Sequence, residues 1–275
     1  MAAKKSMIVE RLRKAQMIEC ISKGKRLDGR GLLDYRPIVI ETGIIEKAEG
    51  SAKVSIGNTQ VIAGVKVEVS EPFPDTPNEG LLVVNAEVLP LASPYTEPGP
   101  PDEDAIELAR VVDRGIRASG MIDLSKLVLV EGEKVIAIYV DVSMLDLDGN
   151  LFDATSYAVV SSLLTARIPK FKVSNEGKVV KLDEYVPLPI RTLPISVTMA
   201  RIGDALIVDP THEEELVMDA RITLTIDSEG NLCAGQKGCS GVLSFEQIKL
   251  ACETAIVKSK EIREIIKKAT GYGKG

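Results

Sequence analysis

Three arginines recur at helical spacing within one short segment of the chain. Segment 102–119 follows two prolines and opens with acidic residues, which is typical of a helix N-terminus. At about 100° per residue, Arg110, Arg114 and Arg117 gather on one side of this helix. The opposite side holds small and apolar residues: Leu108, Val111, Val112, Gly115 and Ile116. Planar guanidinium donors match paired phosphate oxygens, so the arginine row could bind a nucleic-acid backbone.

The same pattern also fits a solvated helix face. Glu107 and Asp113 lie about one turn from the arginines and could neutralise them as ion pairs within the helix. Spacing alone therefore leaves two interpretations open, a phosphate-binding row or a charge-balanced surface. The net charge of −6 does not choose between them, because binding depends on local clustering of cations.

Side chains for other kinds of catalysis are scarce. The chain has one histidine, His212, which we expect to be a solvated loop residue beside three glutamates. The four cysteines, at positions 20, 233, 239 and 252, form no C-x-x-C pair. This inventory argues against a zinc site and against Ser-His-Asp or Cys-His catalysis. We expect no metal and no cofactor.

Composition indicates a folded protein of the reducing cytoplasm. Of 275 residues, 45% are hydrophobic, which rules out global disorder. The longest apolar stretches have the length of strands, far short of the roughly 20 residues that a membrane-spanning helix needs. The first 20 residues alternate charged and apolar side chains and lack the core of a signal peptide. We therefore expect a cytoplasmic protein that does not contact the membrane.

The first part of the chain reads as a helix followed by a sheet and two further helices. Apolar spacing predicts a helix over 5–22, and alternation predicts a hairpin over 51–69 that turns at Gly57-Asn58. Strands are expected at 81–89, 127–130 and 134–145, with a proline-rich loop at 90–101. Asp153 is expected to cap a helix that is apolar nearly all round and therefore lies inside the core.

The second part of the chain has the same order of strands followed by a helix. Strands are expected near 195–201, 205–208, 220–226 and 232–236, and a long helix follows from Ser244, whose spacing to Gln247 is that of a capping box, to about residue 269. Charges and prolines mark 170–194 as a connecting segment. We predict an α+β fold of two sheet-and-helix layered halves in one compact unit. The expected layout is an N-terminal helix (1–23), a first half (24–169), the connection (170–194) and a second half (195–275).

Three stretches carry a resemblance to a known family. KRLDGRGLLDYRPI (25–38), EKAEGSAKVSIGNTQVIAGVK (46–66) and EPGPPDEDAIELARVVDRGIR (97–117) resemble the RNase PH family of phosphorolytic exoribonucleases. Within that family the chain is most similar to the larger, non-catalytic ring subunit of the archaeal exosome. The likeness extends over roughly residues 24–270.

The resemblance implies a fold of ribosomal-protein-like βα units and a hexameric ring in which two kinds of subunit alternate. RNA is shortened from its 3′ end with inorganic phosphate as the attacking group. A cap of subunits with OB-fold and KH-type modules is expected on one face of the ring. Arg110, Arg114 and Arg117 match the arginine positions of the family, so the resemblance favours RNA contact over a solvated face.

Departures from the family pattern argue against catalysis by this chain. Active members carry an Asp-Gly-Gly-Thr-Arg-like segment that cradles phosphate, and the matching stretch here is 148–152, Asp-Gly-Asn-Leu-Phe. Phe152 stands in place of the arginine. A helix N-terminus would normally attract an anion. Here Asp146, Asp148 and Asp153 surround it and are expected to repel phosphate.

Two further departures concern acidic residues. Glu215 falls where active members carry the catalytic aspartate. A downstream aspartate of the family pattern is present as Asp219, but at a spacing shorter by two residues. A plain acidic helix start without function over 213–215 fits these glutamates better. Asp104 replaces an arginine that active relatives place three residues before the position of Glu107. The sequence leaves open whether Asp209 or Asp219 binds a metal.

The favoured interpretation is a non-catalytic exosome ring subunit that supports 3′-to-5′ phosphorolytic RNA degradation. It would structure the active site of a catalytic RNase PH-like partner and bind RNA through Arg110, Arg114 and Arg117, and it would supply no catalytic residue. One alternative is an active phosphate-dependent 3′–5′ exoribonuclease, and another is an architectural protein without RNA contact. In segment 25–30, RNA contact competes with a turn held by Asp28 and Gly29.

Overall fold

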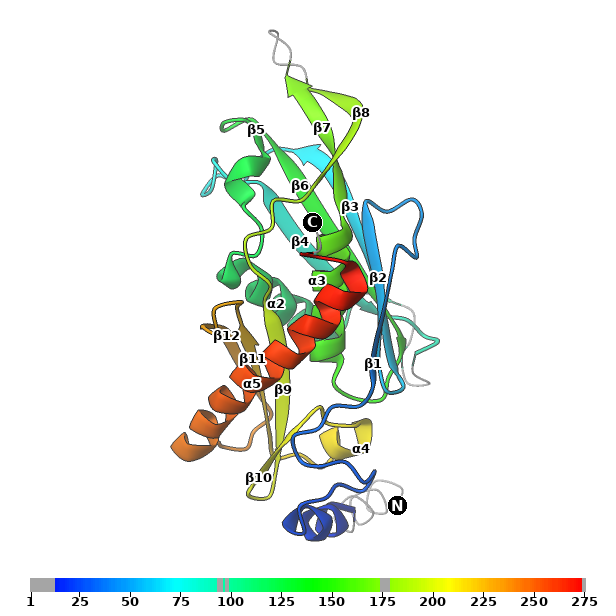
Figure 1. Ribbon diagram of the computed structural model, residues 1–275, viewed down its shortest axis with the longest axis vertical. Helices are drawn as coiled ribbons and strands as arrows, with labels where there is room; N and C mark the ends of the chain where they lie inside the picture. The colour runs from blue at the N-terminus through cyan, green and yellow to red at the C-terminus, as the bar shows by residue number, and fades with distance from the viewer. Residues whose placement is uncertain (1–12, 93–95, 97–98, 174–178, 274–275) are drawn as a thin grey trace.

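The structure is a computed structural model that describes residues 13–92, 96, 99–173 and 179–273. The expected N-terminal helix is present over residues 13–22, and the earlier part of that prediction lies outside the described residues. Met17 and Ile21 of this helix pack under the second sheet against Ala200, Ile202 and Ile207. The helix therefore seals one end of the molecule, opposite the end from which β7 and β8 project (Figure 1).

The first sheet has the order β1-β2-β3-β6-β4. Its strands are β1 (Ile38–Thr42), β2 (Gly50–Ile56), β3 (Thr59–Ser70), β6 (Lys134–Asp146) and β4 (Leu81–Val88), and β5 (Val128–Val130) pairs with one end of β6. All neighbours are antiparallel except β4 and β6. The predicted hairpin is confirmed as β2–β3. Gly57 has φ 58°, which favours glycine, and a Cβ there would lie 2.6 Å from Arg36 Cδ.

The second sheet is fully antiparallel and has the order β10-β9-β11-β12. Its strands are β9 (Ile195–Ile202), β10 (Ala205–Val208), β11 (Ala220–Ile226) and β12 (Leu232–Gly238). All four follow the predicted positions within one or two residues. Between β10 and β11 the short helix α4 (His212–Glu215) replaces the loop expected at His212, which is nevertheless exposed.

Helix α3 (Leu151–Thr165) lies between the two sheets and packs against β2, β3 and β9. Its residues from Phe152 to Leu163 are all buried, which confirms the prediction of a core helix. The predicted cap was wrong, because Asn150 precedes the helix with φ 54° and Asp153 lies inside the first turn. Both sheets and α3 share one hydrophobic cluster, so the two halves form a single α+β core, as predicted.

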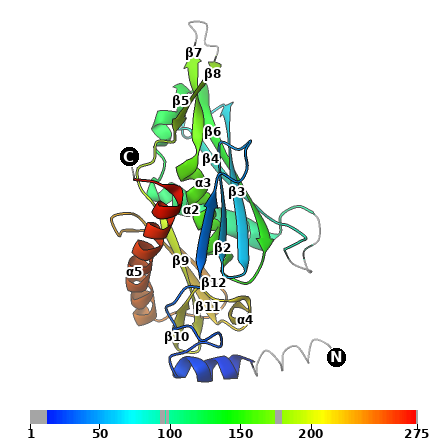
Figure 2. The same ribbon diagram turned by 45° about the vertical axis from the view of Figure 1, so that its right-hand side comes forward.

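Two helices cover the remaining faces of the sheets. Helix α2 (Glu103–Ser119), capped by Asp102, contacts β4 of the first sheet and β12 of the second. Helix α5 (Phe245–Thr270) begins at the predicted capping box of Ser244 and Gln247 and crosses β9 and β11 (Figures 1 and 2). Because α2 contacts both sheets, its exposed face lies where the two halves meet.

The segment expected to be a plain connection contains most of a hairpin. Strands β7 (Arg167–Val173) and β8 (Val179–Pro187) pair with each other and project away from the two sheets (Figure 1). Most side chains of β8 are exposed, so the segment lacks the apolar alternation that identifies a strand in a sequence. A short 3₁₀ helix, η1 (Leu124–Leu127), precedes β5. Among the described residues, no helix is long and apolar enough to cross a bilayer.

Candidate functional site

The arginine row of α2 lies on the exposed side of that helix. Arg110, Arg114 and Arg117 are all exposed, whereas Leu108, Val112 and Ile116 on the other side are buried. Arg110 and Arg114 make no hydrogen bond or ion pair within the described part of the chain. Arg117 differs, because it forms an ion pair with Asp113 at 3.0 Å and donates to the Leu82 carbonyl at 2.6 Å.

The acids that could have neutralised the row are engaged elsewhere or satisfy one arginine only. Glu107 Oε1 accepts from Arg221 Nη2 at 2.8 Å and from Gln236 Nε2 at 3.3 Å, both on the second sheet. Asp113 pairs with Arg117. Local neutralisation therefore accounts for Arg117 but leaves Arg110 and Arg114 without a partner among the described residues. RNA contact by the three arginines remains a prediction.

An aromatic–cation pair fills the start of α3. Phe152, which stands where the resemblance implies an arginine in active members, is buried with 7% exposure. The guanidinium carbon of Arg221 lies 4.0 Å from the centre of its ring. Because Arg221 also pairs with Glu107, its charge is already balanced and partly covered. These three side chains tie α3, β11 and α2 together around the expected phosphate position.

A carboxylate of the protein itself occupies the N-terminus of α3. Glu215 Oε1 accepts a hydrogen bond from the Asn150 backbone N–H at 2.8 Å. Burial raises the pKa of Glu215 to about 7, although the Asn150 N–H bond and the charges of Arg221 and Arg36 act in the opposite direction. A helix N-terminus is a natural anion site, and here the anion is an internal side chain. Glu215 is therefore not the solvated helix start that its sequence context suggested.

The loop that leads into α3 is pressed against α4. Gly149 has φ 82°, and a Cβ on it would lie 2.4 Å from the Thr211 carbonyl carbon. The backbone His212 N–H donates to the Asp148 carbonyl at 3.2 Å. These contacts leave no room for a side chain at position 149, so glycine is required for this close approach.

The expected repulsion by three aspartates needs correction at Asp153. Its carboxylate is fully buried and accepts hydrogen bonds from Tyr35, from the side chain of Asn150 and from Thr198. Burial raises the pKa of Asp153 to about 6, with these hydrogen bonds opposing the shift. The group belongs to the contact between α3 and β9 and is part of the core. Asp148 is half-buried near Arg36, at 3.5 Å, and contacts Asn58.

Asp209 is the centre of a buried cluster of arginines. Arg36 holds its two carboxylate oxygens at 2.9 and 2.8 Å, and Arg30 Nη1 lies 2.8 Å from Oδ2. Asn150 Nδ2 donates to Oδ1 at 2.8 Å. Burial alone would raise the pKa of Asp209, but the hydrogen bonds and charge of Arg36 hold it below its ordinary value. With its oxygens so occupied, Asp209 is a poor metal ligand and instead links Arg30 and Arg36 to Asn150 at the start of α3.

The segment 25–30 forms a structural turn. Arg26 is buried and binds Glu214 through Nε at 2.8 Å and the Val208 carbonyl at 2.7 Å. Asp28 accepts from the Arg30 backbone N–H at 3.0 Å, and Gly29 has φ 86°. The interpretation of this motif as a turn held by Asp28 and Gly29 is confirmed.

The remaining acids of the sequence analysis lie at the periphery. Asp219 pairs with Lys14 at 2.5 Å, which fastens the N-terminal helix to the second sheet. Burial would raise the pKa of Asp219, but the Lys14 hydrogen bond holds it below its ordinary value. Asp104 is exposed in the first turn of α2, where an acid is favourable to the helix dipole. Within the described ranges, no three His, Cys, Asp or Glu side chains group in a way that could hold a metal ion.

Several residues of this region were missed by the sequence analysis. Arg36, Asn150 and Arg221 were assigned no role, although they hold Asp209, Glu215 and Phe152. Arg221 lies 69 positions after Phe152, and nothing local marks the two as partners.

Comparisons with known proteins agree with this geometry. Residues 34–169 match the first domain and residues 192–258 the second domain of the 3′ exoribonuclease family, RNase PH. The chain therefore belongs to this family.

Similar proteins place the chain in a narrower group within this family. The chain is 52% identical to "Exosome complex component Rrp42" of Thermococcus gammatolerans, over 93% of this chain and 94% of the relative. It is 51% identical to the protein of the same name from Pyrococcus abyssi, over 97% of this chain and 98% of the relative. A chain of the Archaeoglobus fulgidus exosome with RNA bound to the active site superimposes with a TM-score of 0.86 at 44% identity, covering 94% of this chain and 98% of that one.

Proposed function

We propose that this chain is a non-catalytic subunit of an archaeal exosome ring and supports 3′-to-5′ phosphorolytic degradation of RNA. It alternates in a hexameric ring with a catalytic RNase PH-like partner, shapes the active site of that partner and holds RNA. OB-fold and KH-type subunits cap one face of the ring, and the complex acts in the cytoplasm. The similarity to exosome components over nearly the whole chain supports this assignment.

One contrast within the structure carries the proposal. Two exposed arginines, Arg110 and Arg114, have no partner in the described part of the chain, while the anion position at the start of α3 is occupied by Glu215. A phosphorolytic enzyme must hold inorganic phosphate beside the RNA end. A subunit that has filled its own anion position but keeps free cations fits the binding of a polymer to be cut elsewhere.

Phosphorolysis assays test the proposal. The purified chain is incubated with 3′-labelled RNA and inorganic phosphate, first alone and then with a purified RNase PH-type ring partner. We expect no release of nucleoside diphosphates by the chain alone and release by the mixture that exceeds that of the partner alone. Release by the chain alone would establish the rival function, an active phosphate-dependent exoribonuclease.

A pair of matched variants tests RNA holding in the assembled complex. We expect Arg110→Ala plus Arg114→Ala to reduce the rate of RNA shortening at limiting RNA. Lys260→Ala plus Lys268→Ala removes the same charge from exposed positions of α5 and serves as the control. If both double variants behave like the unmodified complex, the subunit has only an architectural role.

A further inference from the structure

Two acids of helix α2 lie one turn away from Arg110. Glu107 precedes Arg110 by three positions, and Asp113 follows it by three. Acidic and basic side chains at this spacing are neighbours on a helix surface and can form ion pairs. Nevertheless, Arg110 forms no ion pair with any described residue. The structure must therefore hold both carboxylates away from this guanidinium.

Each of the two carboxylates is held by a different arginine. Asp113 pairs with Arg117, one turn further along α2, at 3.0 Å. Glu107 is directed to the second sheet, where its Oε1 atom accepts from Arg221 Nη2 of β11 at 2.8 Å and from Gln236 Nε2 of β12 at 3.3 Å. Glu107 is therefore withdrawn from its own helix by two donors that are remote in the sequence.

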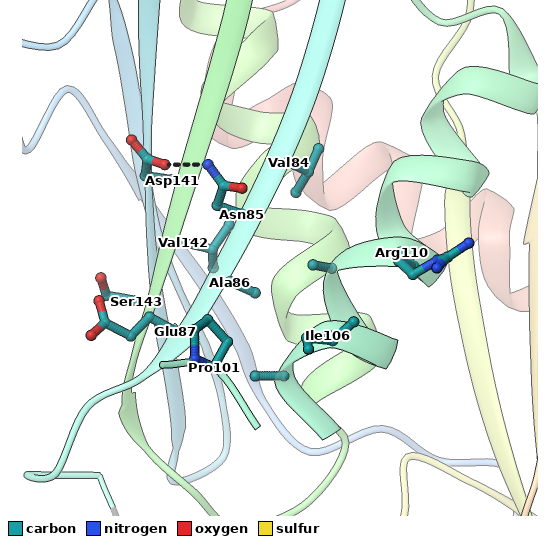
Figure 3. A pocket seen from close by; sticks show the side chains of 12 residues that line it. Val84, Asn85, Ala86, Glu87, Pro101, Ile106, Arg110, Asp141, Val142 and Ser143 are labelled. Atoms are coloured by element: carbon teal, nitrogen blue, oxygen red, sulfur yellow. Dashed lines mark hydrogen bonds between the residues drawn. The ribbon is translucent and has the colours of Figure 1, made fainter. Parts of the chain in front are cut away.

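The acids of the first sheet lie on another side of α2. Glu87 of β4 and Asp141 of β6 line a pocket of about 530 Å³ between these strands and the helix. The Arg110 guanidinium points away from β4, on the far side of α2 (Figure 3). Of these four carboxylates, only those of Glu107 and Asp113 are placed to neutralise Arg110.

The surroundings of Arg221 fix its guanidinium beside Glu107. The Phe152 ring lies against the guanidinium, with 4.0 Å between the ring centre and the guanidinium carbon. Arg221 is paired in register with Gly238 of β12, and a Cβ at position 238 would lie 2.7 Å from Arg221 Nη2, the atom that donates to Glu107. The Arg221 side chain is 13% exposed, so water screens its ion pair less than it would screen a surface pair.

We infer that Arg221 is a positioning residue for RNA binding, which holds the Glu107 carboxylate against the second sheet and so keeps Arg110 free for a phosphate of RNA. This inference rests on the proposed RNA contact of the α2 arginines. Arg221 acts through Glu107 and needs no contact with RNA. A released Glu107 would pair with Arg110 at the i, i+3 spacing and would repel phosphate.

A substitution that changes no charge tests the inference in the complex with the purified RNase PH-type ring partner. Gly238→Ala places a Cβ against Arg221 Nη2 and should displace the guanidinium from Glu107. We expect the affinity for a labelled single-stranded RNA to fall roughly threefold or more in fluorescence anisotropy, because one cation is lost from the phosphate contacts. Gly235→Ala adds a methyl group to the same strand, where it meets Leu224, and serves as the control.

Combined variants separate release of Glu107 from a general disturbance of the fold. The loss caused by Gly238→Ala should disappear when Glu107→Gln is added, because no carboxylate can then be released. Glu103→Gln removes an exposed acid from the first turn of the same helix, and its combination with Gly238→Ala should keep the loss. The loss should also disappear in the Arg110→Ala complex, since the guanidinium that Glu107 would neutralise is gone.

A second route to the same release does not depend on Gly238. Arg221→Met keeps a long apolar side chain against the Phe152 ring and removes the charge that holds Glu107. It should lower RNA affinity in the same way, and Glu107→Gln should again restore it. Arg221→Lys keeps a cation for Glu107 and should retain more affinity than Arg221→Met. Thermal unfolding and native mass spectrometry show that each variant is folded and assembled.

The outcomes separate the inference from the function on which it rests. If Arg110→Ala plus Arg114→Ala leaves the RNA affinity of the complex unchanged, the proposed RNA contact fails and the inference fails with it. If that double variant binds RNA more weakly, but Gly238→Ala behaves like Gly235→Ala or its loss persists with Glu107→Gln, the inference is wrong and the proposed RNA contact stands.

Discussion

The guanidinium carbon of Arg221 lies 4.0 Å from the centre of the Phe152 ring. This contact joins a strand of the second sheet to the first turn of the core helix. It places an aromatic side chain and an already paired cation where the resemblance implies a phosphate-binding arginine in active members. The relationship accounts for both local stability and the absence of a free cation at this point.

Two substitutions separate the packing of Phe152 from its cation–π contact. Phe152→Leu keeps most of the apolar volume and should lower the free energy of unfolding by about 1 kcal/mol through loss of the ring. Phe152→Ala also leaves a cavity and should cost about 3 kcal/mol. Urea unfolding measures both. No loss of stability for Phe152→Leu would show that the contact with Arg221 adds nothing to packing.

Glu215 should make stability depend on pH. Its pKa is raised from 4.5 to about 7 in the folded state, so the cost of charging it grows as pH rises from 4.5 toward 7 and is complete above about 7. At pH 8 the free energy of unfolding of Glu215→Gln should therefore exceed that of the unmodified chain by up to about 3 kcal/mol, since one pKa unit is about 1.4 kcal/mol. The gap should shrink toward pH 5.

A neighbouring acid provides the control for that pH dependence. Glu213 is exposed and pairs with exposed Arg13 at 2.8 Å. Glu213→Gln should show no comparable change between pH 5 and pH 8. A gap for Glu215→Gln that is constant over this range would contradict the role of burial at Glu215.

Asp209 and Asp219 should differ sharply when they lose their charge. Asp209→Asn leaves Arg36 and Arg30 short of a buried counter-charge and should cost about 3 kcal/mol. Asp219→Asn weakens a pair with Lys14 that is more open to water and should cost below about 1 kcal/mol. Chemical denaturation at pH 7 measures both. Similar losses at the two sites would argue against a buried charge cluster around Asp209.

The stability of the protein at acidic pH should depend on the same cluster around Asp209. Because the folded pKa of Asp209 is lowered from 3.8, its stabilising contribution is complete above that value and is lost as pH falls through the lower folded pKa. The Asp209→Asn variant should therefore lose less stability than the unmodified chain between pH 4 and pH 2. Parallel curves for the two proteins would contradict this assignment.

RNA binding by the assembled complex should depend on salt through the α2 arginines. If Arg110 and Arg114 each neutralise one phosphate, replacing both by alanine should reduce the slope of log affinity against log salt by about 1.4. Arg117→Ala should have a smaller effect on this slope, because Arg117 already pairs with Asp113 and Leu82. Fluorescence anisotropy over a salt series measures the slopes. An unchanged slope for the double variant would remove the arginine row from the RNA path.

The sequence by itself determined the elements whose signals are local. The β2–β3 hairpin, α2 and α5 carry alternation, capping residues and a helical apolar stripe within a few positions, so their limits could be predicted closely. The apolar character of α3 indicated its burial in the same way. The similarity of the arginine row to the arginine positions of the family could also be seen in the sequence, because the spacing of these residues lies within one segment.

Only the tertiary structure decided how charged groups are paired. The β7–β8 hairpin was missed because an exposed ribbon lacks a periodic apolar face. Glu107 and Asp113 each lie three positions from Arg110 in the sequence, yet one pairs with Arg221 and the other with Arg117. Glu213 and Glu215 are two residues apart, but one is exposed and the other accepts a hydrogen bond from the Asn150 N–H just before α3. Ion pairing and desolvation depend on distances between segments remote along the chain, and those distances exist only after the two sheets have closed on α3.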